Sequence, residues 1–274
     1  MRAAPQELAP IERVLRRERA IVLAALTVLT LLAWAYLLAG AGTGMSVRSM
    51  STVSFPPPRP SMVMAGPWNA TYWLVMFLMW FVMMIAMMVP SAAPMILLHA
   101  RVTRRSAPHG EMLRSGRTAA AFTTGYLLVW AGFAALATGL QWLLERTGLV
   151  DGMMMWSTER ALTGALLIGA GIYQLTPWKN VCLSQCRSPA ASLAASWRPG
   201  TWGALRMGLV HGSYCLGCCW GLMLLLFAGG IMNVIWIAAL AVIVLVEKLV
   251  ARGLRFSRFL AAALIASGLV ISLS

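Results

Sequence analysis

The chain has 274 residues, of which 60% are hydrophobic and only 11% are charged, a composition that excludes an ordinary water-soluble domain. The net charge of +14 would suit a nucleic acid partner, but the sequence has no basic motif interleaved with stacking aromatic residues. We therefore predict an all-α polytopic membrane protein whose partners are the lipid bilayer and a small ligand, with no nucleic acid.

Seven apolar segments reach the length of about 20 residues that a helix needs to cross a bilayer. In chain order they are 20–40, 70–98, 119–144, 160–177, 204–228, 232–250 and 257–273. We expect them to form a single integral membrane domain over residues 1–274. The fifth and sixth helices are separated only by the Gly229-Gly230 turn.

The basic residues predict the orientation, because cytoplasmic loops of membrane proteins collect Lys and Arg. A cytoplasmic N-terminus places the basic segment 1–19 and the loop 178–203 inside. It leaves only four of the 22 Lys and Arg residues outside, namely Arg48, Arg59, Arg146 and Arg160. The loop 41–69, which contains prolines and methionines, then faces the periplasm. The sequence thus predicts a multi-pass protein of the bacterial inner membrane.

The second apolar segment is unusually rich in methionine. Two adjoining stripes run along it. One, within about 80° of helical arc, contains Met76, Met79, Met83 and Met87, and the other, at about 80–120°, contains Met84, Met88 and Met95. A thioether is a neutral soft donor that suits Cu(I), and it brings no charge to desolvate in the bilayer. Plain packing is the alternative, since methionine fills gaps between helices. His99 and His109 follow in a basic segment, where we expect them to be solvated.

The loop 178–203 contains the sequence CLSQC. Its cysteines, Cys182 and Cys186, are four residues apart and can present both sulfurs to one ion. A structural disulfide is not expected for cysteines that face a reducing cytosol. Two free surface thiols are the alternative interpretation.

The fifth apolar segment contains the sequence HGSYCLGCC. At about 100° per residue, His211, Cys215, Cys218 and Cys219 fall within an arc of about 100° on one helix. They extend over about 12 Å along the axis, which is too long for one coordination sphere, so two linked sites are favoured. Burial of small apolar side chains at a helix interface is the alternative.

Glu247 is the acidic residue at the expected cytoplasmic end of the sixth span, where ionisable groups often mark ion or proton pathways. It could orient His211 or take up a proton as a metal binds. Alternatively, it forms an interfacial ion pair with Lys248, Arg206 or Arg252.

Four strings resemble a family of bacterial metal-binding integral membrane proteins. They are MMIAMMVPSAAPM, CLSQC with the following RSP, HGSYCLGCCW continuing to GLMLLLFAGGIMNVIW, and VLVEKL. Members are described as copper chaperones, in some cases associated with copper oxidases. The resemblance implies a role in metal binding for His211, Cys215, Cys218, Cys219, Cys182, Cys186 and Glu247.

We therefore expect a Cu(I)-binding protein without catalytic activity, which delivers copper to a recipient such as a copper-dependent oxidase or moves it across the membrane. Three alternatives remain open, and one of them is a non-catalytic assembly factor that uses the cysteine helix only for packing. Paired cysteines can relay electrons in a thiol-disulfide or quinone-linked redox enzyme, and they also suit a carrier for mercury or another thiophilic ion.

Overall fold

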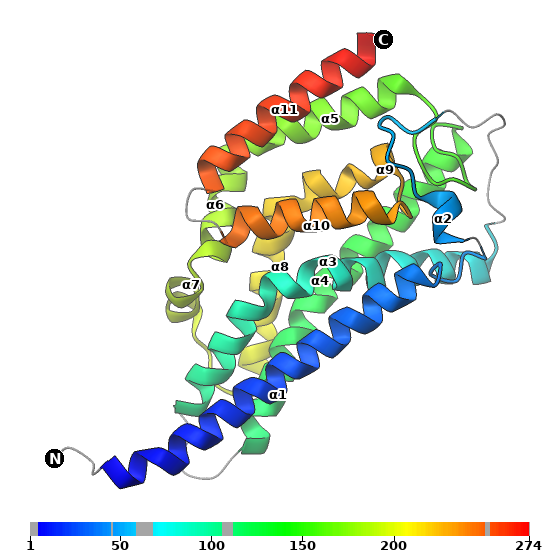
Figure 1. The fold of residues 1–274 in the computed structure, drawn as a ribbon. Helices are drawn as coiled ribbons and strands as arrows, with labels where there is room; N and C mark the ends of the chain where they lie inside the picture. The colour runs from blue at the N-terminus through cyan, green and yellow to red at the C-terminus, as the bar shows by residue number, and fades with distance from the viewer. Residues whose placement is uncertain (1–4, 45, 59–67, 106–111, 250–252, 274) are drawn as a thin grey trace.

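The computed structural model describes residues 5–44, 46–58, 68–105, 112–249 and 253–273. This part of the chain is helical, with a single isolated β-bridge between Val150 and Ser157. The helices are α1 (Pro5–Leu38), α2 (Val47–Met50), α3 (Ala70–Arg105), α4 (Met112–Arg146), α5 (Arg160–Leu175), α6 (Pro177–Arg187), α7 (Pro189–Ser196), α8 (Gly200–Leu224), α9 (Leu226–Gly229), α10 (Val234–Leu249) and α11 (Gly253–Leu273) (Figure 1). The predicted all-α class is confirmed.

Within the described residues, five helices are long and apolar enough to cross a membrane. They are Ala20–Leu38, Ala70–Arg104, Gly116–Arg146, Gly200–Gly229 and Arg255–Leu273. The other two expected spans correspond to α5 and α10, which contain 16 residues each. A helix of that length extends about 24 Å, which is less than the hydrocarbon thickness of about 30 Å.

The surface of the long helices is apolar. Leu31 on α1, Leu136 on α4, and Phe259 and Val270 on α11 are 62%, 75%, 73% and 67% exposed. Contact of such side chains with water is unfavourable, and contact with lipid tails removes that penalty. The exposed side chains and the helix lengths are therefore both compatible with a membrane.

The helices form packed pairs that share a common interior. α1 runs beside α3, and α5 runs beside α11 at the opposite edge (Figure 1). α4 contacts both α3 and α8, and α6 packs on α8. α3 continues as a helix through Pro90 and Pro94 to Arg105. Its methionine-rich half thus lies in the buried core.

The loop 41–69 packs on the start of α10 where it is described. Asn233 donates to the Thr52 carbonyl at 3.0 Å, and Phe55 stacks on Trp236 with ring centroids 4.8 Å apart. Residues 45 and 59–67 of this loop lie outside the described residues.

Close approach of α4 and α8 depends on glycine. A Cβ on Gly125 would lie 2.1 Å from the Leu205 carbonyl oxygen, whereas a Cβ on Gly132 of the same helix meets nothing within 4 Å. We expect Gly125→Ala to lower the free energy of unfolding by about 3 kcal/mol, because backbone atoms must move apart. Thermal unfolding in detergent measures the change. Gly132→Ala should be neutral or slightly stabilising, and equal unfolding of the two variants would contradict this packing.

Candidate metal centre

The three cysteines of α8 face the interior of the bundle. Cys215, Cys218 and Cys219 are at most 2% exposed, whereas Trp220, the next residue, is 39% exposed. α8 contacts α4, α6 and α10. The thiols therefore lie between helices and not against lipid.

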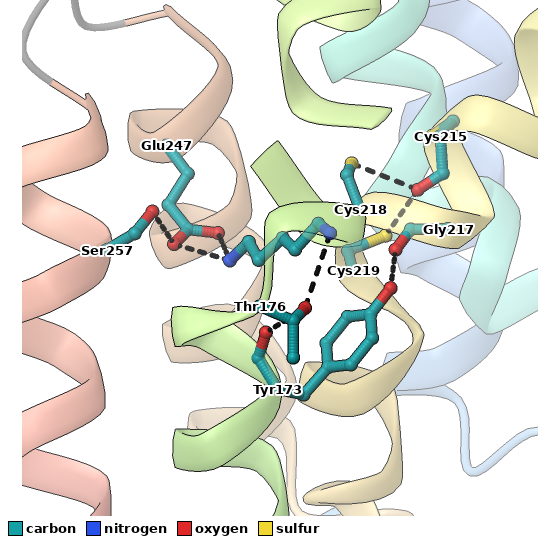
Figure 2. Close-up of polar contacts among 9 residues, drawn as sticks. Tyr173, Thr176, Cys215, Gly217, Cys218, Cys219, Glu247 and Ser257 are labelled. Carbon is teal, nitrogen blue, oxygen red and sulfur yellow. Dashed lines mark hydrogen bonds and ion pairs between the residues drawn. The ribbon is translucent and has the colours of Figure 1, made fainter. Parts of the chain in front are cut away.

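Two of these thiols point back along their own helix. Cys218 Sγ and Cys219 Sγ donate to the carbonyl oxygen of Cys215, at 3.1 and 3.0 Å (Figure 2). These bonds satisfy both thiols locally and keep the two sulfurs beside one peptide group. Cys219 Sγ also lies 3.9 Å from Met88 Sδ on α3, which adds a thioether to the group.

The third thiol, that of Cys215, points toward α4 and α10. The Tyr126 hydroxyl and the Lys248 ammonium each lie 3.0 Å from Cys215 Sγ. Lys248 Nζ also donates to Ser91 Oγ at 3.0 Å, and the Tyr126 hydroxyl donates to the Met88 carbonyl at 3.2 Å. Sequence reasoning did not include Tyr126 or Lys248 among the candidates. The available signal was a lysine at the end of an apolar span, a position where ionisable groups are often functional.

The two cysteines of α6 approach the α8 cysteines from another side. The Cys186 thiol lies beside the thiols of Cys215 and Cys218, and its interaction with them raises the pKa of Cys186 well above its usual value. Cys182 Sγ lies against Gly217 of α8, at 2.7 Å from the place that a Cβ on this glycine would take. Burial raises the pKa of the Cys182 thiol. All five cysteines are free. We call Cys186, Cys215, Cys218 and Cys219, together with Met88, the sulfur cluster.

Glu247 lies apart from the sulfur cluster and forms an ion pair. Lys179 Nζ donates to both carboxylate oxygens of Glu247 at 2.8 Å, and Ser257 Oγ donates to Oε1 at 2.7 Å (Figure 2). Lys179 is fully buried and Glu247 is 2% exposed. The alternative that Glu247 pairs with Lys248 or Arg206 is wrong, because α6 brings Lys179 to the carboxylate; Arg252 lies outside the described residues. The pair fastens α6, and with it Cys186, to α10.

The seven methionines predicted to form stripes on α3 are all buried, with Met95 4% exposed. At most 2% of the side chain is exposed for Met76, Met79, Met83, Met84, Met87 and Met88. Met88 joins the sulfur cluster at one end, and at the other end Met76 Sδ accepts from Gln141 Nε2 at 3.5 Å. The stripes thus extend from the start of α3 to the thiols.

The two described histidines are both buried. His211 is 5% exposed, and its ring centroid lies 5.8 Å from that of Tyr126. His99 is 1% exposed, so the expectation that it is solvated is wrong; α3 extends beyond the predicted span and carries His99 against α4. His109 lies outside the described residues.

Among the described residues, no group of three or more His, Cys, Asp or Glu side chains is arranged so that it could hold a metal ion. The directions of the thiols explain this result, since two of them face a carbonyl oxygen and the third faces Lys248. Rotation about the Cα–Cβ bond is the motion that would redirect each sulfur. The sulfur cluster is therefore a set of adjacent soft donors and not a preformed coordination sphere.

A family model described as PpoB2, copper chaperone, matches residues 77–271. The chain belongs to this family. The matched region of the copper chaperone family begins on α3 and ends on α11, so it contains the methionine stripes from Met79 onward, both α6 cysteines and the whole sulfur cluster. No curated protein and no solved structure gives a match.

Proposed function

We propose that this chain binds Cu(I) at the sulfur cluster and hands it on, either to a copper-dependent oxidase or across the inner membrane. The observation that carries the proposal is the convergence of four thiols and a thioether from α3, α6 and α8 on one place, where all but the partly exposed Cys186 are buried. Thiolates and thioethers are the donors that select monovalent copper. The family description points to the same ion.

Cu(I) binding at this place requires two things of the chain. The ligand thiols lose their protons, and they leave the Cys215 carbonyl to face the ion. Two thiolates are a sufficient set for Cu(I), with Cys215 and Cys218 as the favoured pair because the Cys186 thiol interacts with both of them. Met88 supplies a weaker third donor, and His211 lies one helical turn before Cys215.

The methionine stripes are the proposed path by which copper reaches the cluster. They connect the start of α3 with Cys219 through buried thioethers. Cys182, beside Gly217, is the proposed ligand that receives copper from the cluster. In this proposal α5 and α10 complete seven spans and the N-terminus is cytoplasmic, so that the end of α3 and α6 lie on the cytosolic side.

The test is the metal content of the detergent-purified protein, with wild type compared with Cys215→Ser and Cys218→Ser. We expect about one tightly held Cu(I) per chain in the wild type and its loss in both variants. Trp220→Phe, a change at a lipid-facing position of the same helix, is the matched control and should keep copper. Copper-free protein with a disulfide that quinol reduces would support the redox alternative, and selective retention of Hg(II) would support the mercury carrier.

A further inference from the structure

A second set of soft donors lies beyond the sulfur cluster, toward the end of α3. His99 on α3 and His211 on α8 are both more than nine-tenths buried. The Nδ1 atom of each ring has no hydrogen-bond partner within the part of the chain that the structure describes. A buried polar atom without a partner is costly, so two of them near each other call for an explanation.

One aromatic ring, that of Phe122, lies beside both imidazoles. Phe122 of α4 stacks on His99 with ring centroids 4.9 Å apart, and its centroid is 5.9 Å from that of His211. The two imidazole centroids are therefore at most about 11 Å apart, from these two distances. Trp197 covers His99 at 5.7 Å. The surroundings of both rings are thus aromatic and exclude water.

Each histidine has a buried methionine one helical turn before it. Met95 precedes His99 on α3 and Met207 precedes His211 on α8, and these methionines are 4% and 3% exposed. Side chains four residues apart on a helix are neighbours, with Cβ atoms about 5–6 Å apart. Each helix therefore presents one imidazole and one thioether, which are both neutral ligands for a soft ion.

This second set of donors is adjacent to the first. The His211 ring centroid is 5.8 Å from that of Tyr126, and the Tyr126 hydroxyl touches Cys215 Sγ at 3.0 Å. An ion that leaves the thiols in the direction of His99 meets His211 first. The aromatic rings along this route also favour a desolvated cation through their negative faces.

We propose that His99 and His211, assisted by Met95 and Met207, form a second binding site for a monovalent soft cation between the sulfur cluster and the end of α3. The proposal rests on the proposed function, because its cation is the one that the thiols release. Neutral ligands hold Cu(I) less tightly than thiolates, since they do not neutralise its charge. The site therefore binds an ion in transit.

Ag(I), a monovalent soft ion without redox chemistry, is the probe. In a His109→Ala background, histidine 15N NMR of the full-length protein in detergent reports on His99 and His211 alone. Beyond the first equivalent of Ag(I), we expect the Nδ1 resonances of both rings to shift. The affinity for this later equivalent should fall at least tenfold in His99→Phe, a change that preserves the stacking on Phe122 and removes both ring nitrogens. Met95→Leu should weaken it less.

The near-ultraviolet thiolate-to-metal absorption separates failure of this proposal from failure of the proposed function. Normal thiolate absorption with unshifted histidine resonances overturns the second site and leaves the sulfur cluster intact. Shifted histidine resonances without thiolate absorption overturn the proposed function instead. Unchanged affinity for the later equivalent in His99→Phe also overturns the second site.

Discussion

Glu247→Gln is expected to lower the free energy of unfolding by about 3–5 kcal/mol, because it leaves the buried Lys179 ammonium without its counter-charge. Lys179 is fully buried. In the variant, neither of its two hydrogen bonds to the side chain of residue 247 joins opposite charges any longer. Since Lys179 belongs to α6, the same change should loosen Cys186 from the sulfur cluster. Denaturant or thermal unfolding in detergent measures the first effect, and the rate of Cys186 alkylation in the folded protein measures the second.

Two controls test whether charge is the cause. Glu159→Gln, at an exposed position before α5, should change the free energy of unfolding by no more than about 0.5 kcal/mol. In the double variant Lys179→Met with Glu247→Leu, neither position carries a charge, so no unpaired charge is left there and stability should return to near the wild-type value. A double variant as unstable as Glu247→Gln would show that the shape of the pair matters and not its charge.

Lys248→Met is expected to weaken Cu(I) binding about 100-fold. Cu(I) held by two thiolates has a net charge of −1, and the Lys248 ammonium, 3.0 Å from Cys215 Sγ, brings the total to zero. Removing that ammonium leaves one uncompensated charge in the bundle, which costs about 2.5–3.5 kcal/mol inside a membrane and corresponds to about two decades in affinity. Competition with a chromophoric Cu(I) chelator gives the two dissociation constants.

The charge of the ion provides the control for Lys248. Hg(II) with two thiolates is already neutral, so Lys248→Met should not weaken Hg(II) binding and should shift selectivity away from Cu(I). Lys248→Arg retains the positive charge and should weaken Cu(I) binding far less than Lys248→Met does. Equal losses of Cu(I) affinity in the Arg and Met variants would mean that Lys248 acts through its fit and not through its charge.

The position of the sulfur cluster within the bundle could be predicted only in part. The spacing of Cys215, Cys218 and Cys219 predicted a shared helix face, and the structure buries that face. The spacing of Cys182 and Cys186 suggested a separate pair. In the structure, Cys186 instead lies beside thiols of α8, and Cys182 lies at Gly217. The packing of α6 on α8 determines this difference.

Helix packing also determines which partners the charged residues Glu247 and Lys248 have. Apolar patterning marked Glu247 as unusual, but the three partners considered were chosen by their nearness in sequence or in expected depth. Lys179 is 68 residues away along the chain. Lys248, considered only as a partner of Glu247, instead lies against Cys215, because adjacent residues on a helix point about 100° apart.

The sequence by itself determined the helical class, the apolar surface that suits a membrane, and the grouping of soft donors on α3 and α8. These properties depend on composition and on the helical period, which act within one segment at a time. Only the tertiary structure decided that Met88, Tyr126, Cys186 and Lys248 meet the α8 thiols, and that His99 is buried beside Phe122. Those contacts join helices far apart in the chain, and helix packing depends on the shapes of all the facing surfaces together.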